Sequence, residues 1–184
     1  MAVNKDWIDE ALSRTREQEA RYGHNTGHFT LRVEKENTLI GTLGEIVARE
    51  ALTSVLKQKF ASIEVNLSEL GSFVDLTIKG ANQLRGVHVK TGLWKNWPQD
   101  HFSFGVHSDQ GIQMGLDPLL LVSLLKQDSS LPTKARIEGF VTPEYLRKCA
   151  LIRRGDRFPG TGVQSRTDNL ITYFRDFASI NRIA

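Results

Sequence analysis

The sequence predicts a domain of the α/β class, in which helices pack against a sheet. Three observations support this class: two alternating runs around a turn (residues 72–92), a long apolar helix (42–60) and a continuous apolar run (119–125). With 184 residues and 40% hydrophobic content, the chain can bury one sizeable core, and no linker divides it. We therefore expect a single domain over residues 1–184.

The charge balance permits a polyanionic partner without requiring one. Lys and Arg number 24 against 21 Asp and Glu, which leaves a formal net charge of +3. Cys149 is the only cysteine, which excludes an intramolecular disulfide and suits a reducing compartment. The charged N-terminus lacks the apolar core of a signal peptide, and no apolar run approaches the ~20 residues that cross a bilayer. We expect a cytoplasmic protein without a membrane span.

The stretch at residues 72–92, SFVDLTIKGANQLRGVHVKTG, carries two runs with a period of two, which is typical of strands. If residues 80–83 turn the chain, these strands pair as a hairpin. The apolar side chains then lie on one face, and Asp75, His88 and Lys90 share the other. A carboxylate, an imidazole and an ammonium group are therefore expected on one surface.

Residues 42–60 form the strongest helix prediction, because good helix formers combine with apolar residues over much of the circumference. Glu45 falls on an apolar side, so we expect its carboxylate to be partly buried, where it needs a counter-charge. Two structural roles are also open for this carboxylate. It can complete a T-x-x-E capping box with Thr42, or it can pair with Arg49.

The remaining elements follow from the same periodicities. We expect a helix at 6–22, strands at 61–67, 102–106 and 136–141, a helix from Pro143 to near Leu151, and a last helix at 168–180. The run 119–125 is apolar almost throughout, as expected for a strand buried on both faces in the middle of the sheet.

The helix and the hairpin together resemble the PD-(D/E)xK nuclease superfamily, over residues 42–126. In that family a helix carries a glutamate, a hairpin strand carries an aspartate, and the next strand carries acid-x-lysine. Glu45 matches the glutamate and Asp75, in the run FVDL, matches the aspartate. In the third motif His88 stands where the family has an acid, and Lys90 matches the lysine.

The resemblance implies a restriction-endonuclease-like fold, a mixed β-sheet flanked by α-helices. The matching core spans 42–126, preceded by an N-terminal helix (1–23) and followed by a C-terminal strand, helices and a basic loop (127–184). Between Lys90 and Leu119 this chain has a loop and a strand where the family core has a helix.

The resemblance also implies roles for the site residues. Asp75 would bind a divalent metal together with the Val89 carbonyl, Glu45 would complete the metal site, and Lys90 would position the nucleophilic water. His88 is less negative than the acid that it replaces, which weakens magnesium binding and favours manganese or softer metals. Alternatively, His88 acts as a base or lies outside the metal shell.

Two further segments suit contacts with nucleic acid. Trp94, Lys95 and Trp97 interleave aromatic and basic residues beside the candidate site, where rings can stack on bases and Lys can meet phosphates. The more common role of such tryptophans is to anchor a core or a loop. The loop 153–166 is the most basic in the chain, and it can contact phosphates or remain an ordinary solvated loop. Its arginines are Arg153, Arg154, Arg157 and Arg166.

The sequence therefore predicts a nuclease that hydrolyses DNA with Mg²⁺ or Mn²⁺, and it is compatible with a homodimer. Two other functions stay open: a catalytically inactive nucleic-acid-binding module of the same fold, and a protein-interaction domain whose basic loop contacts an acidic partner. In a purely structural interpretation, Asp75, His88 and Lys90 form the solvated face of an ordinary hairpin.

Overall fold

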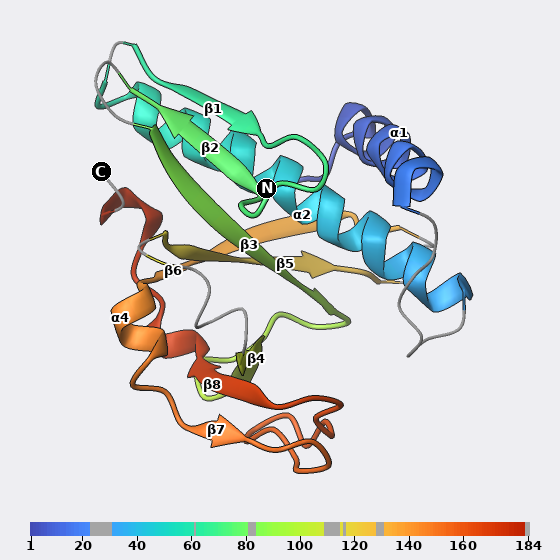
Figure 1. The fold of residues 1–184 in the computed structure, drawn as a ribbon, viewed down its shortest axis with the longest axis vertical. Coiled ribbons are helices and arrows are strands. Elements are labelled where there is room, and N and C mark those ends of the chain that lie inside the picture. Colours follow the sequence, from blue (N-terminus) through green and yellow to red (C-terminus); the bar gives the residue numbers. More distant parts are fainter. Residues whose placement is uncertain are drawn as a thin grey trace.

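The computed structural model describes residues 1–22, 31–60, 62–80, 84–108, 115, 117–127 and 131–182, with backbone alone at 22 and 31–35. The described elements form an α/β fold, in which helices cover a mixed sheet and a second, smaller sheet lies at the other end of the molecule from the N-terminal helix (Figure 1).

The main sheet has the strand order β1-β2-β3-β5-β6 within the described ranges. Its strands are β1 (Glu64–Leu67), β2 (Leu76–Lys79), β3 (Leu84–Trp94), β5 (Leu119–Leu125) and β6 (Lys134–Val141). Neighbours pair antiparallel, except that β3 and β5 are parallel. The predicted hairpin is therefore confirmed as the β2–β3 pair, while the middle of its predicted turn, residues 81–83, lies outside the described part of the chain.

Strand β5 is buried along its whole length. Leu120, Val122 and Leu124 belong to the core beneath the long helix, whereas Leu119 packs in a second cluster with Val106. Successive side chains of a strand point to opposite faces, so both faces of β5 are covered. The prediction of a strand buried on both sides inside the sheet is confirmed.

The long helix α2 (Leu31–Lys57) begins well before the predicted start at residue 42. Thr42 is buried in the helix interior, so the predicted capping box is wrong. Gly44 explains how the helix lies so close to the sheet, because a Cβ at this position would come within 1.9 Å of the Thr91 Oγ1 on β3. Tertiary packing thus outweighs the local cost of glycine in a helix.

Helix α1 (Lys5–Tyr22) packs on α2 and confirms the predicted N-terminal helix. Arg49 on α2 joins the two helices by pairing with Glu10 on α1, at 2.6 Å between the guanidinium Nη1 and the carboxylate Oε1. No helix within the described residues is both long enough and apolar enough to span a membrane.

The C-terminal part differs from the prediction. The helix expected at 168–180 is replaced by strand β8 (Asn169–Tyr173) and two short 3₁₀ turns, and α4 (Pro143–Leu146) is a single turn that stops well before residue 151. The apolar spacing in 168–180 fits a strand as well as a helix, and pairing with β4 selects the strand. Thr172 is fully buried and donates its hydroxyl proton to the Phe104 carbonyl, at 3.1 Å.

The second sheet is formed by β4 (Ser103–His107), β8 and β7 (Leu151–Ile152), with β8 in the middle. Val106 on β4 packs against Leu119, and this contact brings the second sheet up to the face of the main sheet that α2 does not cover. The strand predicted at 102–106 is confirmed as β4, and the basic loop 153–166 connects β7 to β8.

Candidate active site

The candidate site lies where β2 separates from β3. Their pairing ends at Leu76 and Val87, and one further hydrogen bond joins the Asp75 N–H to the Val87 carbonyl at 3.1 Å. Beyond this point β3 continues along β5 as far as Trp94, without β2 beside it. A strand edge that is no longer paired within the sheet presents backbone N–H and C=O groups to whatever lies next to it.

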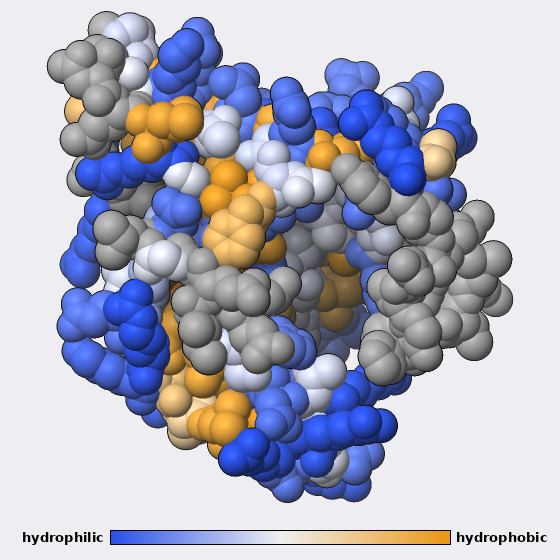
Figure 2. Space-filling view, viewed as in Figure 1, coloured by the Kyte–Doolittle hydropathy of each residue, from blue (hydrophilic) through white to orange (hydrophobic). Residues whose placement is uncertain are grey.

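A cleft of about 780 Å³ opens beside this strand edge. Its walls come from α2, the connection between β1 and β2, β3 itself, and single residues of β4 and β5. Figure 2 shows the hollow on this face of the molecule, with both hydrophobic and hydrophilic side chains around it. All four predicted catalytic residues line the cleft: Glu45, Asp75, His88 and Lys90.

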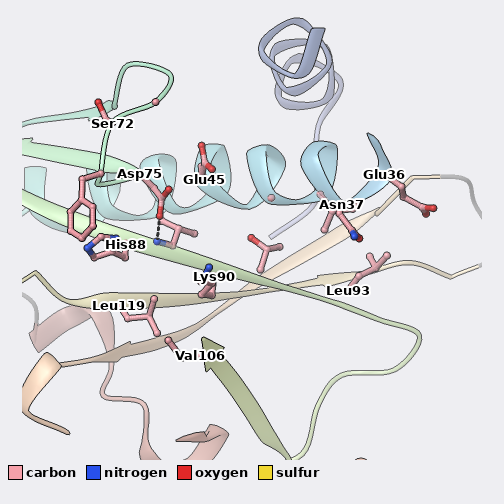
Figure 3. A pocket seen from close by; sticks show the side chains of 16 residues that line it. Glu36, Asn37, Glu45, Ser72, Asp75, His88, Lys90, Leu93, Val106 and Leu119 are labelled. Atoms are coloured by element: carbon pink, nitrogen blue, oxygen red, sulfur yellow. Dashed lines mark hydrogen bonds between the residues drawn. The ribbon is translucent and has the colours of Figure 1, made fainter. Parts of the chain in front are cut away.

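Asp75 is held at the strand edge by the backbone. Its Oδ2 accepts a hydrogen bond from the Val89 N–H at 2.7 Å, drawn as the dashed line in Figure 3. Burial raises the pKa of this carboxyl above its usual value, while the Val89 N–H and the positive charges of Lys90 and His88 act in the opposite direction. The Val89 N–H thus fixes the carboxylate in place, and the neighbouring positive charges offset only part of the cost of burying its negative charge.

Glu45 lines the same cleft from the α2 side. Burial, and then the negative charge of Asp75, raise its pKa from 4.5 to about 7, against the lowering effect of Arg14 and Lys90. The alternative partner considered from the sequence, Arg49, pairs instead with two other glutamates of the helices. The charges that act on the Glu45 carboxylate are therefore those of Asp75, Arg14 and Lys90, and not that of Arg49.

Lys90 supplies a positive charge to the two carboxylates. It is half-buried on β3, and burial lowers the pKa of its ammonium, while the charges of Asp75 and Glu45 raise it. Its position is inconsistent with the solvated face of an ordinary hairpin. An ammonium that is partly desolvated interacts more strongly with nearby anions than one in bulk water.

His88 is buried in the wall of the cleft, with 9% of its surface exposed. Its Nε2 is buried and has no hydrogen-bond partner, and the ring meets the ring of Phe73 edge-on, with centroids 5.2 Å apart. Burial lowers the pKa of the imidazole, against the raising effect of Asp75 and Asp117. A neutral imidazole can offer one nitrogen lone pair to a metal or to a proton donor.

The site wraps around the edge of β3. Val87 and Val89 belong to the core beneath α2, so alternation places His88 and Lys90 together on the opposite face, as the sequence predicts. Glu45 approaches from the α2 face. Glu45, on one face of β3, and His88 and Lys90, on the other, line the same cleft because β2 stops at this point and leaves the edge of β3 open between the two faces.

The donor set fits a hard divalent cation in its chemistry. Asp75 and Glu45 provide carboxylate oxygens, and Glu45 carries a raised pKa that a nearby cation would lower. Both backbone groups of a strand residue face the same side of the strand, so the Val89 carbonyl faces the side of β3 on which its N–H bonds Asp75. Within the described residues, however, no three His, Cys, Asp or Glu side chains gather closely enough to form a metal-binding group.

Neither predicted tryptophan lines the cleft. Trp94 packs on Phe102 and Phe174, with ring centroids 6.3 and 5.5 Å apart. The Arg136 guanidinium lies 4.9 Å above the ring centre of Trp97, and Lys95 is exposed nearby on the chain. The rings therefore serve as anchors between β3, β6 and the second sheet, which was the more common role expected for them.

The arginines of the basic loop also lie outside the lining of the cleft. Arg153 pairs with Asp168 at 2.9 Å, Asp168 also accepts the Arg154 N–H, and the Arg157 guanidinium donates to the Gly162 carbonyl. Arg166 belongs to the same loop. The loop is thus partly tied down by its own contacts and stands at the end of the second sheet (Figure 1).

Two residues of the site did not emerge from the sequence. Arg14 on α1 donates from Nη2 to the Ser68 carbonyl at 2.8 Å, and its charge lowers the pKa of Glu45. Phe73 lines the cleft although it is 58% exposed. Arg14 sits among many charges on α1 with nothing to distinguish it, whereas a phenylalanine on the polar side of the hairpin pattern is a signal that could have been noticed.

Comparison with known proteins does not assign the chain to a family. No protein-family model, no curated protein and no solved structure matches it.

Proposed function

We propose that this protein is a metal-dependent nuclease that hydrolyses phosphodiester bonds in DNA, on a core of the restriction-endonuclease-like type. The observation that carries the proposal is the arrangement at the end of the β2–β3 pairing. The Asp75 carboxylate accepts a hydrogen bond from the Val89 N–H there, and Lys90 and Glu45 line the same cleft. Two acids and a lysine converge from three separate elements.

Each residue has a role that its surroundings support. Asp75 and Glu45 would hold Mg²⁺ or Mn²⁺ with the Val89 carbonyl, and His88 would lie beside this group on β3. A bound divalent cation supplies Lewis-acid charge for the phosphoryl oxygens and lowers the pKa of water. Lys90 would orient the attacking water and stabilise the additional negative charge that develops on the phosphate.

The test is cleavage of plasmid and linear DNA by the full chain with Mg²⁺ or Mn²⁺, comparing Asp75→Ala with Glu64→Ala. Glu64 is an exposed acid on β1 of the same sheet, outside the cleft, so it serves as the matched control. We expect Asp75→Ala to lower the rate at least about 100-fold and Glu64→Ala to leave it unchanged. Wild-type activity in Asp75→Ala, with circular dichroism showing a folded chain, would refute the assignment.

A second function is favoured by one observation: His88, whose neutral form burial favours by lowering its pKa, lines the cleft where the nucleases that this chain resembles carry an acid. On this alternative the chain is a nucleic-acid-binding module of the same fold that does not cut. It would bind DNA with an affinity that falls steeply with salt, and no divalent metal would yield cleavage products.

A further inference from the structure

Phe73 lines the cleft from the connection between β1 and β2, and a hydrogen bond joins the two ends of this connection. The segment 68–75 joins β1 to β2, and its ends are linked by a hydrogen bond from the Ser68 N–H to the Asp75 carbonyl at 3.0 Å. Within it, the Ser72 N–H donates to the Glu69 carbonyl, also at 3.0 Å. The Phe73 ring therefore extends from a loop that two backbone hydrogen bonds hold in shape, two residues before Asp75.

The ring is oriented toward the site but remains largely open. Its edge-on contact with the His88 ring, at 5.2 Å and 88° between planes, fixes it beside the cleft. Figure 3 shows His88 and Asp75 close to this loop, which also carries Ser72. Even with this contact, 58% of Phe73 stays exposed, which leaves aromatic surface for a further partner.

No other aromatic residue in the described part of the chain takes this position. Among the described residues that line the cleft, Phe73 is the only phenylalanine, tyrosine or tryptophan. Phe60 is similarly exposed, at 46%, but lies beyond the end of α2 and outside the cleft. An exposed ring beside a catalytic acid is thus a local feature of this site.

The size of the cleft limits what can stack on this ring. The cleft volume of about 780 Å³ falls within the range of about 300–1,000 Å³ that encloses one small ligand, so a nucleotide or a strand end can enter it. The faces of bases inside a duplex are covered by their neighbours, whereas an unpaired base offers a free face to an aromatic side chain. Phe73 and Asp75 are two residues apart in the bent end of this segment and both line the cleft, so a phosphate held at Asp75 would have its adjacent base in the same cleft as the ring.

We propose that Phe73 is a specificity-determining residue that stacks on an unpaired base next to the scissile phosphate, so that the protein acts on single-stranded DNA or single-stranded ends in preference to duplex. This inference rests on the proposed nuclease function for the identity of the ligand. One side chain, Phe73, would recognise unpaired DNA, so this recognition can be removed by mutation without changing Asp75 or Lys90.

The test measures binding by fluorescence anisotropy with EDTA present, so that nothing is cut. The probe is a labelled single-stranded DNA of about 12 nucleotides, compared with the same strand in a duplex and with versions carrying one abasic position. We expect Phe73→Ala to weaken single-strand binding about 5- to 100-fold, and Phe73→Trp to preserve it with quenching of the added tryptophan. The matched control Phe60→Ala should bind as the wild type does.

The abasic series separates stacking from a merely structural role. One abasic position should weaken binding to the wild type and have no further effect on Phe73→Ala, because both changes remove the same contact. The inference is overturned if Phe73→Ala binds single strands as tightly as the wild type, if the abasic loss persists in Phe73→Ala, or if wild type binds duplex and single strand equally.

The same proteins assayed with Mn²⁺ distinguish this inference from the proposed function. Phe73-dependent binding without cleavage by the wild type would support the stacking role and refute the nuclease. Cleavage of DNA by the wild type with Phe73→Ala unimpaired in single-strand binding would overturn the stacking role and leave the nuclease standing.

Discussion

The main sheet carries an acid and a lysine at two places, and the surroundings of the two pairs differ. Glu64 on β1 and Lys79 on β2 lie directly opposite each other in the antiparallel register, and both side chains are exposed. Asp75 and Lys90 lie at the other end of the hairpin, partly buried in the cleft. We call these the surface pair and the cleft pair.

Burial, and not residue type, distinguishes the cleft pair from the surface pair. In the cleft pair, burial raises the pKa of Asp75 and lowers that of Lys90, so each charge is costly to bury without the other. In the surface pair, water and salt screen both charges. Perturbed acids and bases grouped in a cleft are typical of catalytic sites.

The largest expected difference concerns the two lysines. Lys90→Ala should lower the rate of DNA cleavage at least about 100-fold, because no other described cation lines the cleft, whereas Lys79→Ala should change it less than about 2-fold. Initial rates with saturating Mn²⁺ and Mg²⁺ provide the measurement. Equal losses in the two variants would mean that overall charge, and not the cleft, governs activity.

Glu45→Gln should stabilise the metal-free protein at neutral and alkaline pH. The folded-state pKa of about 7 lies above 4.5, so folding favours the protonated carboxyl, and this contribution is complete below pH 4.5 and lost as the pH rises through 7. Since one pKa unit corresponds to about 1.4 kcal/mol, the loss reaches about 3 kcal/mol, and glutamine does not suffer it.

Urea unfolding in EDTA at pH 4.5, 6 and 8 measures this effect. The gain in the free energy of unfolding for Glu45→Gln should increase over that series. A gain for Glu45→Gln that is the same at all three pH values would contradict burial as its cause.

A smaller effect is expected from His88. If its Nε2 adjoins the metal, His88→Glu should raise the ratio of magnesium-supported to manganese-supported cleavage about 10-fold, because a carboxylate suits a hard cation better than an imidazole. Cleavage rates over a concentration series of each metal give the ratio. An unchanged ratio in a folded variant would place His88 outside the metal shell.

The smallest effect is expected when the surface pair is removed altogether. The double variant Glu64→Ala/Lys79→Ala should change the free energy of unfolding by about 0.5 kcal/mol or less, because opposite charges that are exposed to water attract each other only weakly. Urea denaturation at pH 7 is the measurement. A loss of several kcal/mol in the free energy of unfolding would show that the charges of the surface pair are not simply solvated.

Local patterns predicted the elements whose partners lie nearby in the chain. The period of two in residues 72–92 predicted the β2–β3 hairpin, and the apolar run predicted β5 buried on both faces. The same reasoning failed at 168–180, where a helical spacing of apolar residues is instead β8 paired with β4, a strand far away in the sequence. Such long-range pairing leaves no local signature.

The sequence by itself determined which charged residues would be grouped. The alternation along the hairpin places His88 and Lys90 on one face, close to Asp75, because the period of the backbone and the register of an antiparallel pair follow from local geometry. It also indicated that Glu45 would be partly buried on its helix.

Only the tertiary structure decided how these residues meet. β2 stops at Leu76 and opens the edge of β3, Gly44 allows α2 to approach Thr91, and the segment 68–75 brings Phe73 to the mouth of the cleft. Each of these outcomes depends on contacts between elements that are distant in the sequence. Desolvation, which perturbs the site's pKa values, arises from that packing and from no single residue.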